Sequence, residues 1–155
     1  MQESASTAIY PAAGTGAPIA FAYATLGLLN EMHEFTEAEA LDEVAEAGDV
    51  LWYLAALQRE IDAVLPGQAV DVTRCVFDPA DAWDQALILA GKVKKLLRGD
   101  HANIALAVKG LTPTYLVCRD NLLSMEASVE AMDYNAKKLA DRADRGVIRG
   151  SGDHR

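Results

Sequence analysis

The chain has 155 residues, of which 51% are hydrophobic, and its formal net charge is -9. This length and apolar content predict one domain with a sizeable buried core rather than two independent domains. The negative charge disfavours a nucleic-acid polymer as the main partner, because binding to a phosphate backbone requires a basic surface.

The N-terminal residues 1–16 are rich in Ser, Ala and Gly, so they predict a flexible arm ahead of a single all-α domain over residues 17–155. The apolar run from Ala17 to Leu29 is too short to span a bilayer, and no basic segment precedes it. We therefore expect a cytoplasmic protein with no membrane partner. Cys75 and Cys118 lie far apart in the sequence and are expected to be reduced thiols.

Helix-forming residues dominate from about Pro18 to Asp62, and no Gly, Pro or Asn separates Glu34 from Glu46. One long helix is therefore an alternative, but it would string out the acidic residues of this stretch and leave no site. We predict instead a hairpin of two helices that turns near Ala40.

Three further helices are expected after a linker, at about residues 81–99, 103–121 and 124–145. Gly110 and Pro113 should kink the second of these or start it afresh, because proline removes a helix hydrogen bond. Taken together, the sequence predicts an all-α bundle of four to five helices.

Two pairs of acids at helical spacing are the main functional signal in this chain. Residues three apart share one face of a helix, so antiparallel packing of the two helices would gather four carboxylates in one patch. Their repulsion in a partly desolvated site is tolerable when a cation neutralises it. Oxygen ligands on rigid helices suit Mg2+, with Mn2+ as an alternative ion. The alternative explanation of these acids is a solvent-exposed acidic helix face without a metal. The predicted metal ligands and catalytic groups are Glu31, Glu34, Glu46 and Asp49.

The segments around these acids, residues 23–34 and 46–54, resemble the MazG-like all-α nucleotide pyrophosphohydrolases, whose signature is Glu-Glu-x-x-Glu followed by Glu-x-x-Asp. A third match begins at Asn135 and runs through Lys138 and Arg142 into the C-terminal tail. The three segments follow the family's order and cover less than half of the chain. The resemblance implies cleavage of a nucleoside or deoxynucleoside triphosphate to its monophosphate and pyrophosphate, with Mg2+ held by the motif acids, in a homo-oligomer such as a dimer or tetramer.

Two departures from the family pattern affect this expectation. The first Glu of the signature is Asn30, which is a hydrogen-bonding group rather than a strong metal ligand. The family's Lys-rich turn after the first motif is missing, and a similar basic string occurs only at residues 92–95. Neutralisation of the substrate phosphates must then come from elsewhere in the fold.

The candidate substrate-binding residues are Asn30, Trp52, Tyr53, Lys92, Lys95, Asn135, Lys138 and Arg142. Trp52 and Tyr53, together with Tyr23, are expected to stack on a nucleobase, although aromatic residues at such positions also build cores. Lys138 and Arg142 lie four apart on one helix face and are expected to meet triphosphate oxygens, with a solvated surface as the alternative.

Residues 17–65 and 81–145 share a weak internal similarity that aligns Glu31 and Glu34 with Lys92 and Lys95. Either the second half is a degenerate copy, or two amphipathic hairpins resemble each other by chance. If it is a copy, we expect both lysines to face the acidic residues, within the chain or across a subunit interface.

The sequence as a whole predicts a Mg2+-dependent nucleoside triphosphate pyrophosphohydrolase. A P-loop NTPase and a ferritin-like oxidase are disfavoured, because neither a P-loop glycine motif nor a Glu-x-x-His pair is present. The alternative is a catalytically silent helical module that binds a nucleotide or a partner protein, and Asn30 keeps that alternative open.

Overall fold

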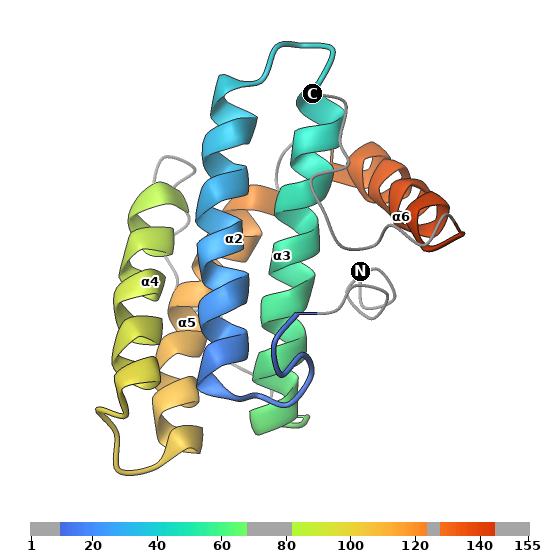
Figure 1. Ribbon diagram of the computed structural model, residues 1–155. Coiled ribbons are helices and arrows are strands. Elements are labelled where there is room, and N and C mark those ends of the chain that lie inside the picture. The colour runs from blue at the N-terminus through green and yellow to red at the C-terminus, as the bar shows by residue number, and fades with distance from the viewer. Residues whose placement is uncertain (1–9, 68–81, 124–127, 145–155) are drawn as a thin grey trace.

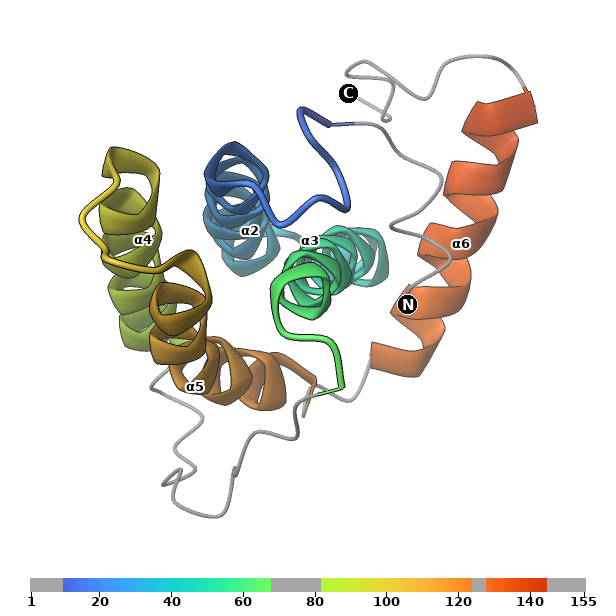
Figure 2. The same ribbon diagram turned by 90° about the horizontal axis from the view of Figure 1, so that it is seen from below.

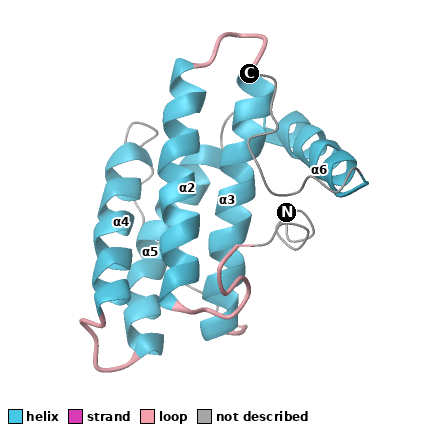
Figure 3. Ribbon diagram, in the orientation of Figure 1, coloured by secondary structure: helices cyan, strands magenta, loops and turns pink. Residues whose placement is uncertain are grey.

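The computed structural model describes residues 10–67, 82–123 and 128–144 of the chain (Figure 1). The described residues fold into helices and contain no strand, which confirms the all-α prediction (Figure 3). The helices are α2 (Pro18–Glu37), α3 (Glu43–Val64), α4 (Ala82–Arg98), α5 (Ile104–Leu123) and α6 (Ser128–Asp144). None of them combines the length and the apolar character that a membrane crossing requires.

The predicted hairpin between α2 and α3 is confirmed, and the single long helix is excluded. The backbone becomes extended at Ala38, with φ -67° and ψ 140°, and this residue ends α2. The turn therefore lies around Ala40, where the sequence placed it. Asp42 occupies the N-cap position of α3 without a side-chain capping bond, while its carbonyl accepts the Glu46 amide at 3.0 Å.

Helix α5 is continuous across Pro113, so the expectation that Gly110 and Pro113 would start a new helix is wrong, while the alternative expectation of a kink stays a prediction. Its first turn is stabilised by Asn103, whose side-chain oxygen accepts the amide of Ala105 at 2.8 Å and that of Leu106 at 3.3 Å. Buried side chains on both sides of the proline hold the helix against its neighbours, which offsets the lost hydrogen bond.

Helices α2 to α5 surround a common core, and α6 lies outside them across α3 (Figures 1 and 2). Helix α3 is central, since it packs against α2, α5 and α6, while α4 packs against α2 and α5. The largest fully buried side chains of this core include Phe21, Leu28, Leu54, Leu57, Leu89, Leu111 and Tyr115. The expected last helix is described from Ser128 onward, and its proposed start at Ser124 lies outside the described residues.

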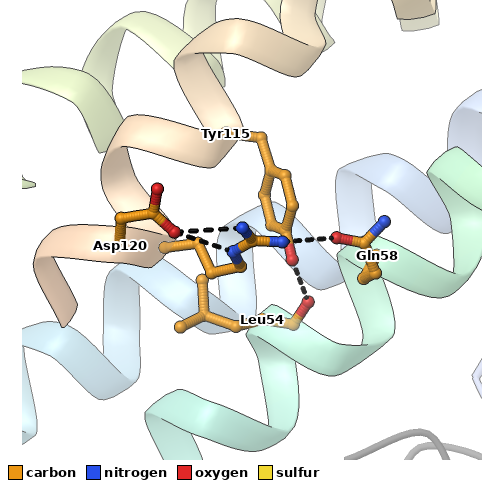
Figure 4. A network of polar contacts seen from close by, with 5 residues as sticks. Leu54, Gln58, Tyr115 and Asp120 are labelled. Carbon is orange, nitrogen blue, oxygen red and sulfur yellow. Dashed lines mark hydrogen bonds and ion pairs between the residues drawn. The ribbon is translucent and has the colours of Figure 1, made fainter. Parts of the chain in front are cut away.

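Polar contacts fix α5 to α3 through two neighbouring side chains (Figure 4). The buried Tyr115 hydroxyl donates to the Leu54 carbonyl at 2.8 Å. One turn later, Arg119 donates to Gln58 at 3.2 Å and pairs with Asp120 at 3.0 Å. These bonds set the height of α5 along α3 more specifically than apolar packing alone.

Residues 10–16 differ from the flexible arm that the sequence predicted for residues 1–16, of which 1–9 lie outside the described residues. They form turns closed on the fully buried carboxylate of Glu60 in α3. Glu60 accepts the Tyr10 hydroxyl at 2.6 Å, the Gly14 amide at 2.5 Å and the Gly16 amide at 2.7 Å. A buried carboxylate needs such donors, and the segment supplies them.

Candidate metal centre

Three carboxylates from two antiparallel helices meet at one end of the α2–α3 hairpin. Glu31 of α2 and Glu46 and Asp49 of α3 each present an oxygen within 4.8 Å of the others, and all three side chains are half-buried. The buried small residues Ala47 and Gly48 lie between the two α3 acids and allow the helices to approach closely. We call Glu31, Glu46 and Asp49 the acidic cluster.

The acidic cluster concentrates negative charge at a partly buried place. The pKa of Glu31 is raised from its ordinary value of 4.5 to about 7, first by burial and then by the charges of Asp49, Glu34 and Glu46. The charge of Lys138 opposes this rise but does not cancel it. One oxygen of Glu46 is also shielded from solvent. A cation placed among these groups would reduce the repulsion between them.

Lys138 of α6 reaches into the acidic cluster. Its ammonium nitrogen lies 2.6 Å from Asp49 Oδ1, and the two side chains are only 13% and 21% exposed. The sequence predicted a phosphate contact for Lys138, and that role stays a prediction. What the structure adds is a cation already bound to one of the predicted metal ligands.

In the structure three of the four predicted acids converge, whereas Glu34 lies near them outside the acidic cluster. Glu34 is close enough for its charge to raise the pKa of Glu31, but it is not among the three converging groups. Its Oε1 accepts the Asn30 side-chain amide at 3.0 Å. Asn30 thus orients the neighbouring acid, which a glutamate at that position would repel.

Trp52 and Tyr53 follow Asp49 by three and four residues, so they share its face of α3. Their rings meet edge to face at 4.8 Å. Burial, and then the neighbouring Tyr23 and Glu31, raise the pKa of Tyr53, which places this ring next to the acidic cluster. A Cβ at Gly27 would lie 2.0 Å from the Tyr53 ring, so a glycine is required in α2 for the ring to pack there.

Tyr10 and Tyr23 complete an aromatic cluster with Trp52 and Tyr53. The Tyr10 and Tyr23 rings are stacked at 5.2 Å with an interplanar angle of 4°, and the Trp52 ring meets Tyr10 edge-on at 6.1 Å. Sequence reasoning missed Tyr10, because it lies in the segment predicted to be an arm. An aromatic residue just before Pro11, within a stretch of small residues, was the available signal.

The prediction that Lys92 and Lys95 face the acidic cluster is wrong for Lys92 within this chain. Its ammonium group donates to the Gly110 carbonyl at 3.1 Å and to the Thr114 hydroxyl at 2.9 Å, because its helical phase turns it toward α5. Lys95 is exposed in the last turn of α4, which ends beside the start of α2, away from the acidic cluster (Figure 1).

The aligned residues Glu31 and Lys92 nevertheless occupy similar positions in the α2–α3 and α4–α5 hairpins. Each faces the second helix of its own hairpin: Glu31 faces Asp49 of α3, and Lys92 faces Gly110 of α5. Common descent of the halves 17–65 and 81–145 stays a prediction.

Asn135, Lys138 and Arg142 all lie in α6 at spacings that put their backbone positions on one face of the helix. The bond from Lys138 to Asp49 shows that this face of α6 lies toward α3. Arg142, one turn further along α6, is half-buried. The C-terminal match in the sequence and the acidic motif are thus brought together by the packing of α6 on α3.

Comparisons of the chain with known protein families, with curated proteins and with solved structures find no match.

Proposed function

We propose that this protein is a Mg2+-dependent nucleoside triphosphate pyrophosphohydrolase, which converts a nucleoside or deoxynucleoside triphosphate to its monophosphate and pyrophosphate. The observation that carries the proposal is the convergence of Glu31, Glu46 and Asp49 from two antiparallel helices. Homo-oligomeric assembly belongs to the same proposal.

The residues of the acidic cluster fit a divalent cation. Their donors are all carboxylate oxygens, which is the ligand type that Mg2+ and Mn2+ prefer. Their oxygens lie within 4.8 Å of one another, whereas neighbouring ligands in an octahedral Mg2+ shell are about 3 Å apart, so small side-chain rotations would bring them onto one ion. The raised pKa of Glu31 comes first from burial and then from the neighbouring acids, and a bound cation would offset the repulsion between these groups.

In this proposal each part of the site has a separate task. When bound, Mg2+ would supply charge to neutralise the phosphates and lower the pKa of a water molecule. Glu31, Glu46 and Asp49 hold that charge in place. Lys138 and Arg142 lie on the α6 face that approaches the acidic cluster, where charge-assisted bonds to phosphate oxygens would orient the substrate.

The aromatic cluster adjoins the acidic cluster and would bind the nucleobase. Tyr23 is 41% exposed, and because one face of its ring stacks on Tyr10, a nucleobase would stack on the other face.

The direct test measures pyrophosphate release from a panel of ribo- and deoxynucleoside triphosphates, with Mg2+, with Mn2+ and with chelator. Replacing Glu46→Gln or Asp49→Asn should lower turnover by roughly 100-fold or more, because each change removes a ligand charge while the shape is kept. Glu39→Gln, in the exposed α2–α3 turn, is the matched control and should keep wild-type turnover. Near-wild-type turnover by either folded amide variant would reject the assignment.

A second candidate function is a silent nucleotide-binding or protein-binding module. The ion pair between Lys138 and Asp49 favours it, because a cation from the chain itself already neutralises one acid. Calorimetry with a non-hydrolysable nucleoside triphosphate separates the two functions. Binding by a chain that releases no pyrophosphate from any nucleotide in the panel would support the silent module.

A further inference from the structure

Helix α6 is the least embedded helix of the described chain. It packs mainly on α3, whereas α2 to α5 each contact at least two other helices of the bundle (Figure 2). Among its described side chains, Leu139 is buried with 8% exposure, and Lys138 bonds to Asp49 of α3. A polar contact that holds α6 on α3 therefore ends inside the acidic cluster.

The bond from Lys138 uses an atom that a metal would also need. The ammonium nitrogen lies 2.6 Å from Asp49 Oδ1, and both side chains are largely shielded from water, so the contact is a strong charge-assisted hydrogen bond. Asp49 offers one of the three oxygens that converge in the acidic cluster. A divalent cation at those oxygens would lie within a few ångströms of the ammonium group, where like charges repel strongly in a partly desolvated site.

We propose that Lys138 is the resident cation of the acidic cluster, that a divalent cation displaces it from Asp49, and that this displacement loosens α6 from α3. The inference rests on the proposed function, since it concerns occupancy of the same site. It gives Lys138 two positions: on Asp49 in the metal-free protein, and free for substrate phosphate in the metal-bound protein. Metal loading would then prepare the lysine that the substrate needs.

Binding of Mn2+ to the intact chain tests the first part, measured by electron paramagnetic resonance of the free ion. Lys138→Ala should bind Mn2+ about tenfold more tightly than wild type, a size typical of coupled equilibria, because the competing cation is gone. Lys138→Arg keeps the charge and should bind as wild type does. Lys137→Ala is the matched control: it removes an exposed lysine from the same helix, and its affinity should stay within about twofold of wild type.

Hydrogen exchange of α6 in the wild-type protein, with and without Mn2+, tests the second part. Mn2+ should speed amide exchange in α6 by about fivefold or more, while exchange in the core of α3 should not increase. In Lys138→Ala, α6 should exchange fast already without Mn2+ and should not respond to it.

Two results would overturn this inference while leaving the proposed function standing: Mn2+ binding that is equal in wild type and Lys138→Ala, or α6 exchange that slows or stays constant when Mn2+ binds. Absence of Mn2+ binding in wild type would instead remove the proposed function, and this inference with it.

Discussion

Glu31 is electrostatically strained in the acidic cluster, because it is half-buried and faces Asp49, Glu34 and Glu46. Its pKa of about 7 lies above the ordinary value of 4.5, so the folded protein binds a proton that the unfolded chain releases between these two pH values. Proton binding by Glu31 therefore stabilises the folded state. This stabilisation is fully present below about pH 4.5 and is lost as the pH rises to about 7.

Glu31→Gln should therefore stabilise the metal-free protein at pH 8, by on the order of 1 to 2 kcal/mol after allowance for solvent screening. The gain should shrink as the pH is lowered toward 5, because wild-type Glu31 then becomes neutral. Urea denaturation in chelator at both pH values measures it. Glu37→Gln, at the exposed end of the same helix, is the control. If the variant and the wild type differ in free energy of unfolding by the same amount at both pH values, the predicted repulsion at Glu31 is contradicted.

At the scale of elements, the N-terminal segment and α3 are joined by one carboxylate. Glu60 is fully buried and accepts three hydrogen bonds from residues 10–16, including the Tyr10 hydroxyl. Through Tyr10, this junction also fixes the ring that stacks on Tyr23. The arrangement of the aromatic rings thus depends on a contact that lies about two helical turns beyond Trp52 and Tyr53 on α3.

Glu60→Gln should lower the free energy of unfolding by roughly 1 to 3 kcal/mol, because one acceptor oxygen is replaced by a donor that faces backbone amides. Amide exchange at Gly14 and Gly16 should speed up in the same variant. Asp62→Asn is the control: its contact with Gln58, at 3.0 Å, lies within the helix and contributes less than about 0.5 kcal/mol. Unchanged stability together with unchanged exchange at both glycines would show that the segment does not depend on Glu60.

At the scale of the whole molecule, a ligand that binds only the folded chain must stabilise it. Mg2+ or Mn2+ at about 100 times its dissociation constant should raise Tm by roughly 5 to 10 °C for a chain of this size. Glu46→Gln should lose this shift, and Glu39→Gln should keep it. Differential scanning calorimetry with metal and with chelator measures the effect. A wild-type Tm that does not respond to either ion would count against the metal site.

The sequence by itself determined the helices, the turn near Ala40 and the meeting of acids from both helices, because these depend on helical periodicity and on the packing of neighbours in the chain. Of the four acids predicted to meet, Glu31, Glu46 and Asp49 converge and Glu34 does not. Only the tertiary structure decided which group each charged side chain meets. Lys138 bonds to Asp49 across 89 residues, and Lys92 bonds to α5 instead of the acidic cluster. Such partners depend on the rotation of one helix against another, which local sequence does not encode. The same reason explains residues 10–16: their small, turn-forming residues indicated an arm, whereas a buried carboxylate 44 to 50 residues away gave them a fixed place.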